Sequence, residues 1–149
     1  MSANVLIRPI GEDEREAWNP LWAGYLTFYK TTLAREISDT AWARFHDPDE
    51  PLFALGGYLD GRLLGIAHYL FHRSTWAPVC YCYLEDLFVE PSARGSGAGR
   101  ALIAAVEAAG REAGASRLYW MTHETNQTAQ QLYNQVAERP GFVQYRKKL

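Results

Sequence analysis

The chain is poor in cysteine and histidine, and its charges nearly cancel. It has 149 residues with 2 cysteines, 4 histidines, and 15 basic against 17 acidic side chains, for a net charge of −2. So small a charge gives no reason to expect nucleic acid or an anionic membrane surface as a partner. No apolar run reaches membrane-spanning length, and the N-terminus lacks the apolar core of a signal peptide. We therefore expect no membrane association.

The two cysteines, Cys80 and Cys82, fall in a segment that we expect to be a strand, on one face and about 7 Å apart. That separation is too large for an easy disulfide, so we expect reduced thiols and a cytoplasmic protein. The histidines show no spacing typical of metal ligands, which predicts that no metal is bound. The length suits one domain with a sizeable core, which we place at residues 1–149.

Hydrophobic periodicity and turn signals predict a mixed α/β fold. We expect strands at residues 5–10, 52–58, 62–72, 80–89, 117–122 and 142–147. We expect helices at residues 12–30, from 38 or 39 to 45, from the glycine-rich loop to 113, and from 125 or 126 to 137. The Asp60-Gly61 pair predicts a hairpin. This order implies a mixed sheet with helices on both faces.

The most informative segment is a strand, a glycine-rich loop and a helix start, which together span residues 83–100. A helix N-terminus has free N–H groups and the positive end of the helix dipole, so it attracts phosphate. Gly95, Gly97 and Gly99 let backbone amides approach an anion closely, and Arg94 and Arg100 add charge-assisted hydrogen bonds. The segment predicts a bound pyrophosphate. The alternative is a glycine-rich turn with no ligand.

The loop differs from two common phosphate-binding motifs, because no Gly-Lys-Ser/Thr follows it and its glycines have the wrong spacing for a dinucleotide fingerprint. The pattern Arg94-x-x-Gly97-x-Gly99 resembles the acetyl-CoA pyrophosphate loop of the GNAT superfamily of N-acetyltransferases. The resemblance implies acetyl-CoA as donor and a mostly antiparallel sheet that splays where the loop begins. By this resemblance we expect the donor to contact Leu87, Phe88, Val89, Arg94, Gly95, Ser96, Gly97, Ala98, Gly99, Arg100, Asn126, Ala129 and Tyr133.

Tyr133 is the candidate general acid. GNAT enzymes often carry an asparagine near the start of the corresponding helix and a tyrosine about two turns later, as Asn126 and Tyr133 are here. A phenol with a pKa near 10 is protonated at neutral pH and can donate its proton to the departing CoA thiolate. The alternative is a helix tyrosine that packs in the core.

Glu85 is the candidate general base, because a carboxylate in an apolar strand costs energy unless it is paired or functional. Strand alternation predicts that Tyr81, Tyr83, Glu85 and Leu87 share one face, with Asp86 on the other face. A salt bridge or a helix cap is the alternative role for either carboxylate. By resemblance, a backbone N–H near Leu87 donates to the oxyanion.

Residues 83–89 resemble the fourth strand of spermidine/spermine (diamine) N-acetyltransferases, and residues 25–30 and 119–126 resemble a fungal branch that acetylates histones, polyamines or D-amino acids. The resemblance implies a homodimer. Trp22, Tyr25 and Phe28, which are aromatic side chains at helical spacing, line either the acceptor pocket or the core. The residues that we expect to contact the acceptor amine are Tyr25, Phe28, Trp76, Glu85, Asp86 and Glu124.

The sequence thus predicts an N-acetyltransferase that moves the acetyl group of acetyl-CoA to a primary amine by direct attack in a ternary complex. The acceptor is a small molecule or a peptide: a polyamine, a small amine or amino acid, or a lysine side chain. Two alternatives stay open, a non-catalytic acyl-CoA-binding module and an enzyme for a longer acyl-CoA. The module would need the glycine-rich loop but neither Glu85 nor Tyr133.

Overall fold

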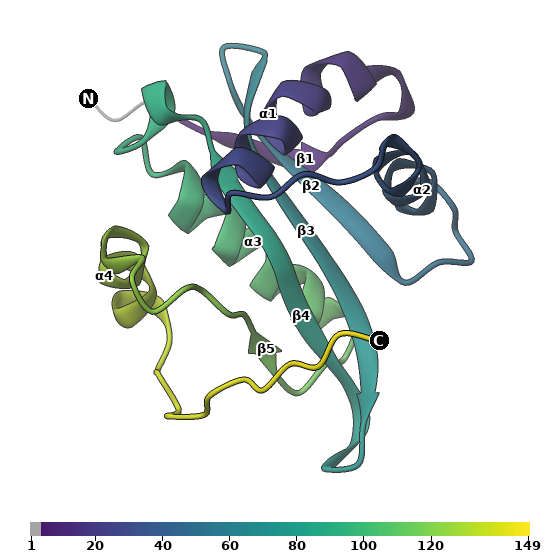
Figure 1. The fold of residues 1–149 in the computed structure, drawn as a ribbon, viewed down its shortest axis with the longest axis vertical. Coiled ribbons are helices and arrows are strands. Elements are labelled where there is room, and N and C mark those ends of the chain that lie inside the picture. The colour runs from purple at the N-terminus through teal and green to yellow at the C-terminus, as the bar shows by residue number, and fades with distance from the viewer. Residues whose placement is uncertain (1–3) are drawn as a thin grey trace.

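A five-stranded sheet forms the centre of the molecule in the computed structural model, which describes residues 4–149 (Figure 1). The strands lie side by side in sequence order: β1 Leu6–Pro9, β2 Leu52–Leu59, β3 Arg62–Ser74, β4 Ala77–Val89 and β5 Leu118–Tyr119. The first four pair antiparallel, and β5 joins the edge of β4 in parallel. The predicted mixed α/β fold is confirmed, with β2 and β3 joined at the Asp60-Gly61 turn.

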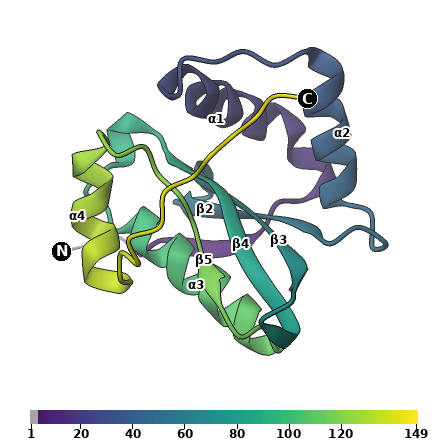
Figure 2. The ribbon, with the colours of Figure 1, turned by 60° about the horizontal axis from the view of Figure 1, so that its bottom comes forward.

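Helices cover both faces of this sheet (Figures 1 and 2). Helices α1 (Arg15–Phe28) and α2 (Arg35–Phe45) lie on one face, which we call the α1 face, and α3 (Ala98–Glu112) lies on the other, the α3 face. Helix α4 (Gln127–Val136) packs against the apolar cluster of α3 through Leu132, Tyr133 and Val136. Short 3-10 turns at Glu12–Glu14 and Pro91–Ala93 precede α1 and the glycine-rich loop.

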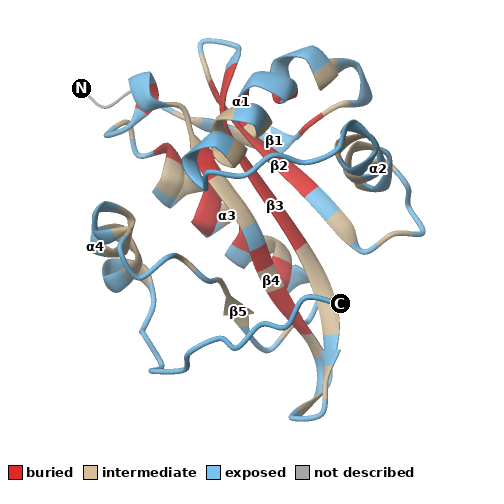
Figure 3. Cartoon of the chain, in the orientation of Figure 1, coloured by how far each residue is buried: buried red, intermediate tan, exposed pale blue. Residues whose placement is uncertain are grey.

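The two largest apolar cores hold the layers together, one on each face of the sheet. Figure 3 marks the buried residues in red along the central strands and α3. On the α1 face, Trp18 and Leu21 pack against strand residues that include Ile66 and Phe88. On the α3 face, Leu102 and Val106 pack against strand residues such as Leu84. Full burial of a large aliphatic side chain contributes about 1.5–3 kcal/mol, so these two cores fix α1 and α3 on either side of β4.

Two helices on the α1 face differ from the predicted boundaries. Helix α1 begins at Arg15, after a 3-10 turn, instead of at residue 12, and it includes Pro20. Helix α2 begins at Arg35 instead of at residue 38 or 39. The side chains of Ser38 and Asp39 contact helix α1. The Trp22 Nε1–H donates to Ser38 Oγ (2.9 Å), and Arg15 Nη2 pairs with Asp39 Oδ1 (2.6 Å).

The predicted strand at residues 142–147 is wrong, since this segment is extended but forms no strand ladder. It crosses in front of β4 (Figure 1), and its apolar side chains stay in solvent: Phe142 is 84% exposed and Tyr145 is 93% exposed. Strand β5 is also shorter than the predicted 117–122. A two-residue β5 offers the segment too little edge to pair with.

None of the helices among residues 4–149 is long and apolar enough to cross a membrane.

Candidate active site

The sheet opens between β4 and β5. The two strands pair only at Cys82 with Leu118 and at Tyr83 with Tyr119, whereas β4 continues to Val89. Within residues 4–149, the stretch 84–89 therefore has a strand neighbour on the β3 side alone. We call this stretch the open edge of β4. Its backbone groups are available to a ligand, and the glycine-rich loop follows directly after it.

A β-bulge at Glu85 begins this edge. On β3, His68 and Tyr69 are neighbours, but they pair with Asp86 and Leu84, so Glu85 is the extra residue on β4. An extra residue reverses the alternation of side chains beyond it. The predicted faces are therefore wrong for Asp86 and Leu87: Asp86 lies on the α1 face with its partner His68, and Leu87 packs on the α3 face.

The bulge brings two carboxylates together under helix α1. Desolvation of the Glu85 carboxyl, and then the negative charge of Asp86, raise the pKa of Glu85 above its ordinary value, although the residue as a whole is exposed. Burial, and then the charge of Asp86, also raise the pKa of Tyr25 on α1. The Asp86 side chain is only 14% exposed. Glu85, Asp86 and Tyr25 thus form one electrostatically coupled group.

Two buried residues, Trp18 and His68, form a hydrogen-bonded line that ends at Asp86. The Trp18 Nε1–H donates to His68 Nε2 (3.0 Å), and His68 Nδ1 lies 2.9 Å from Asp86 Oδ2. Trp18 is fully buried and His68 is 3% exposed. Neither residue was among those predicted from the sequence. The sequence does contain a signal for His68. It lies inside the apolar run at residues 63–71, and a buried histidine needs a hydrogen-bond partner just as Glu85 does.

The glycine-rich loop has the predicted geometry for an anion. Gly95 and Gly97 have φ angles of +85° and +88°, and no atom lies within 4 Å of where a Cβ would stand on either. Gly97 caps α3, whose first turn contains no acidic residue. Free N–H groups, the helix dipole and the absence of side chains fit a pyrophosphate. Gly99 differs, because a Cβ there would contact Leu132 of α4 at 3.5 Å.

The loop arginines are both at the surface and engaged. Arg94 donates from Nε to the carbonyl of Val89 (3.2 Å), and its guanidinium lies 5.8 Å from the ring centre of Phe88. Arg100 donates to Gln135 on α4. A cavity of about 540 Å³ lies beside the loop, between it and the β2–β3 hairpin; Arg94, Gly95 and Ser96 line it together with Leu59, Asp60, Arg62, Leu64, Ser92 and Ala93.

Helix α4 carries the candidate acid. Asn126 stands at its N-terminus, and its Nδ2 donates to Thr122 Oγ1 (3.1 Å). Tyr133 is half-buried against the α3-face core, with its ring 5.5 Å from that of Trp120. Burial, and then the nearby Tyr29, raise the pKa of Tyr133 to about 12, so its phenol holds its proton at neutral pH. Ala129 lies one turn earlier on the same helix.

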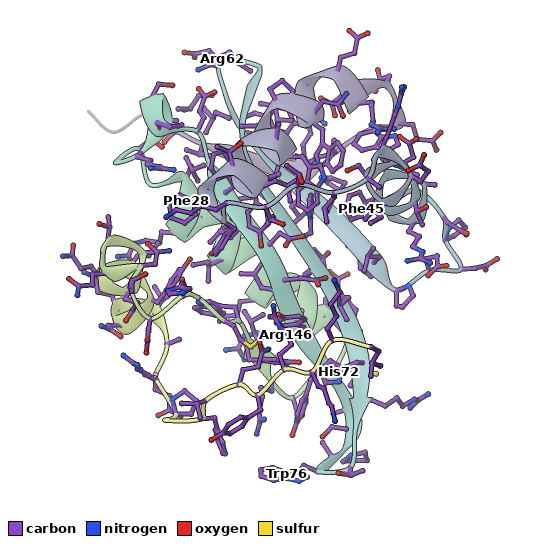
Figure 4. All side chains as sticks on the ribbon, in the orientation of Figure 1. Phe28, Phe45, Arg62, His72, Trp76 and Arg146 are labelled. Carbon is purple, nitrogen blue, oxygen red and sulfur yellow. The ribbon has the colours of Figure 1, made fainter. Side chains whose placement is uncertain are left out.

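The structure brings only some of the predicted acceptor residues together. Tyr25 lies beside the two carboxylates and stacks on Trp22 at 5.3 Å, and Phe28, at the end of α1, is 47% exposed. Glu124 is exposed before α4. Trp76 stands apart at the tip of the β3–β4 hairpin (Figure 4), where Arg117 lies over its ring. The aromatic stripe of α1 thus divides between core and surface.

A second aromatic group, which was not predicted from the sequence, lies near β5. Tyr83 stacks on Tyr119 at 4.8 Å, and His72 Nε2 lies 2.6 Å from the Tyr119 hydroxyl. Burial, and then the charge of Glu85, raise the pKa of Tyr83 to about 12, which Arg146 opposes. Arg146 belongs to the C-terminal segment and lies over this region in Figure 4. These residues extend the surface around Glu85 toward β5.

Residues 4–149 hold no group of three or more histidine, cysteine, aspartate or glutamate side chains placed to bind a metal ion.

The fold and the glycine-rich loop at the open edge define an acyl-CoA-dependent transferase. Residues 12–137 match the model of the Acetyltransferase (GNAT) family, and the chain belongs to this family. It is an acetyltransferase with acetyl-CoA as its donor. This class favours the enzyme over the non-catalytic module.

Among known proteins, the chain is 37% identical over 145 residues to the D-amino-acid N-acetyltransferase HPA3 of Saccharomyces cerevisiae, covering 96% of this chain and 90% of that one. Two solved structures show the same fold. The aminoglycoside N-acetyltransferase AAC(6')-Iy, in complex with a bisubstrate analogue, has a TM-score of 0.85 at 21% identity and 99% coverage of both chains. A ribosomal-protein-alanine N-acetyltransferase from Brucella melitensis has a TM-score of 0.79 at 21% identity, covering 98% and 100%.

Proposed function

We propose that the protein N-acetylates a primary amine on a small molecule, with free D-amino acids as the first acceptors to test and polyamines and lysine side chains next. The carboxylate pair at the β4 bulge carries this proposal, because Glu85 and Asp86 offer negative charge to an ammonium group. The similarity to HPA3 along 96% of the chain favours D-amino acids. Arg146, which lies near Tyr83, offers a positive charge to the acceptor's carboxylate.

The donor is held, in this proposal, by the loop and the start of α3. The N–H groups of Gly95, Gly97, Gly99 and Arg100 and the Arg94 and Arg100 side chains bind the pyrophosphate, whereas the N–H groups of Ser96 and Ala98 donate within the loop. Residues 87–89 on the open edge bind the pantetheine arm by backbone hydrogen bonds, and a backbone N–H near Leu87 stabilises the oxyanion. Asn126, Ala129 and Tyr133 of α4 complete the other wall.

The transfer proceeds by direct attack of the amine on the thioester carbonyl. Glu85 takes the proton from the acceptor's ammonium group, directly or through a water, so that the nitrogen lone pair can form the new N–C bond. The C–S bond breaks, and Tyr133 gives its proton to the departing thiolate. Neither cysteine is needed as a nucleophile: Cys82 is fully buried, and burial raises the pKa of its thiol to about 11.

The acceptor panel is the experiment for this proposal. CoA release from acetyl-CoA is measured with matched D- and L-amino acids, spermidine, putrescine, an aminoglycoside and a histone-tail peptide. We expect the highest kcat/KM with D-amino acids and a large preference over their L-enantiomers. A higher kcat/KM with spermidine or the peptide would replace the proposed acceptor, and release from propionyl-CoA at an equal rate would widen the donor class.

The pH profile tests Glu85. Because its pKa is raised, its basic form is lost as pH falls through a value above the ordinary 4.5, so kcat at saturating amine declines on the acid side. We expect Glu85→Gln to lower kcat by roughly 100-fold and to flatten this acidic limb. The matched control is Glu107→Gln on the exposed side of α3. An unchanged acidic limb in Glu85→Gln would assign the limb to another group.

A homodimer in the cytoplasm completes the proposal. The exposed Phe142, Val143 and Tyr145 on the C-terminal segment are available to a second copy, and the two free cysteines suit a reducing compartment. We expect light scattering to give twice the chain mass, and Phe142→Glu to shift the protein toward monomer. A monomeric mass for the unmodified chain would contradict the dimer.

A further inference from the structure

In the hydrogen-bonded line of Trp18, His68 and Asp86, chemistry decides which group donates and which accepts. An indole N–H only donates, so the Nε2 of His68 has to accept and carries no proton. The imidazole proton therefore resides on Nδ1, where it is donated to Asp86 Oδ2 at 2.9 Å. Protonation of both ring nitrogens would set an N–H against the Trp18 N–H. The line directs the His68 donor at Asp86 and leaves neither ring nitrogen without a partner.

The surroundings of His68 keep this arrangement rigid. The ring lies among Trp18, Trp22 and Phe45, with centroid distances of 5.9, 5.3 and 4.5 Å, and is 3% exposed. Helix α1, which supplies two of these rings, packs directly on β4, since a Cβ on Gly24 would come within 2.8 Å of Phe88. A side chain so enclosed has little room to change its rotamer.

Asp86 receives a fixed orientation from this support. Oδ2 accepts from His68, and the carboxylate also faces Glu85 and Tyr25. The pKa of Tyr25 is raised by burial, and then by the charge of Asp86 and a side-chain hydrogen bond to it. The Asp86 side chain is only 14% exposed, so its remaining oxygen faces mainly Tyr25 and Glu85.

We propose that Trp18 and His68 are positioning residues that hold Asp86 as the carboxylate that binds the acceptor's ammonium group, while Glu85 is the carboxylate that removes its proton. This inference rests on the proposed amine acetylation. It assigns two roles to two adjacent carboxylates. Asp86 is held by its hydrogen bond to His68 and binds the ammonium group. Glu85, at the bulge, is freer to exchange a proton.

Two substitutions of His68 separate the positioning role from general packing. In His68→Asn the amide nitrogen stands close to the place of Nδ1 and keeps the donor to Asp86. In His68→Gln the amide oxygen reaches the place of Nε2 and keeps the acceptor for Trp18, but loses the donor. We expect His68→Gln to raise the amine KM about tenfold with kcat within about twofold, the effect of one lost charge-assisted hydrogen bond. His68→Asn keeps the wild-type KM within about threefold.

Acetyl-CoA affinity by calorimetry is the control for folding, and we expect both variants to retain it. A second variant, Asp86→Asn, keeps the side-chain shape and removes the charge, and it raises the amine KM at least as much as His68→Gln. If the wild-type protein acetylates the amine but His68→Asn and His68→Gln change the amine KM equally, the positioning role is wrong. The proposed acetyltransferase activity is then unaffected. If the wild-type protein acetylates no amine, the proposed function is wrong, and so is the binding role of Asp86.

Discussion

Tyr133→Phe is expected to lower kcat by roughly 100- to 1,000-fold, while the affinity for acetyl-CoA stays within about twofold. The substitution removes one hydroxyl from a half-buried ring that otherwise keeps its packing against Trp120. Burial raises the pKa of this phenol to about 12, so the wild-type side chain is a proton donor at every pH at which the enzyme is assayed. Steady-state kinetics with the best amine and calorimetry with acetyl-CoA measure the two quantities.

Tyr69→Phe is the matched control for this prediction. Tyr69 is also a buried tyrosine with a raised pKa, but it lies on β3, where its ring stacks on that of Phe53. We expect kcat to change less than twofold in the control. A Tyr133→Phe enzyme with wild-type kcat would assign thiolate protonation to water or to another side chain.

Gly97→Glu is expected to weaken acetyl-CoA binding on the order of 100-fold, equivalent to the loss of one or two charge-assisted hydrogen bonds. The φ angle of residue 97 is +88°, a conformation that costs a residue with a Cβ about 1–2 kcal/mol. The new carboxylate also stands at the N-terminus of α3, where it competes with the pyrophosphate for the same N–H groups.

A second glycine separates backbone strain from loss of the anion site. Gly114 follows α3 at its C-terminal end with a φ angle of +80°, and no atom lies within 4 Å of where its Cβ would stand. Gly114→Glu therefore imposes the same strain at the other end of the helix, and we expect its acetyl-CoA affinity to equal that of the wild-type protein. Equal weakening in both variants would mean that strain, and not the loop, controls binding.

Much of the fold could be predicted from the sequence because its signals are local. The Asp60-Gly61 turn, the glycines after β4 and the apolar stripe of α3 each act over a few residues. The C-terminal segment could not be predicted in the same way. Its pattern is that of a strand, but a strand needs a neighbour, and β5 is only Leu118–Tyr119.

The candidate site was predictable in its parts but not in its arrangement. Glu85 and Asp86 were found as polar residues in an apolar strand, yet strict alternation placed Asp86 on the wrong face. The bulge opposite His68 and Tyr69 depends on how β3 and β4 pair. The sequence of β4 alone contains no signal for it. The contact of Trp18 with His68 joins residues 50 positions apart, so only the folded chain reveals it.

Direct transfer between two bound substrates is tested most plainly by counting products. The protein is mixed with acetyl-CoA, with and without the best amine of the panel, and the released CoA thiol, the N-acetylated amine and the intact mass of the protein are measured together. We expect one thiol for each acetylated amine, no release without amine, and no acetyl group on the protein. Thiol release without amine, or acetylated protein that disappears when amine is added, would contradict direct transfer.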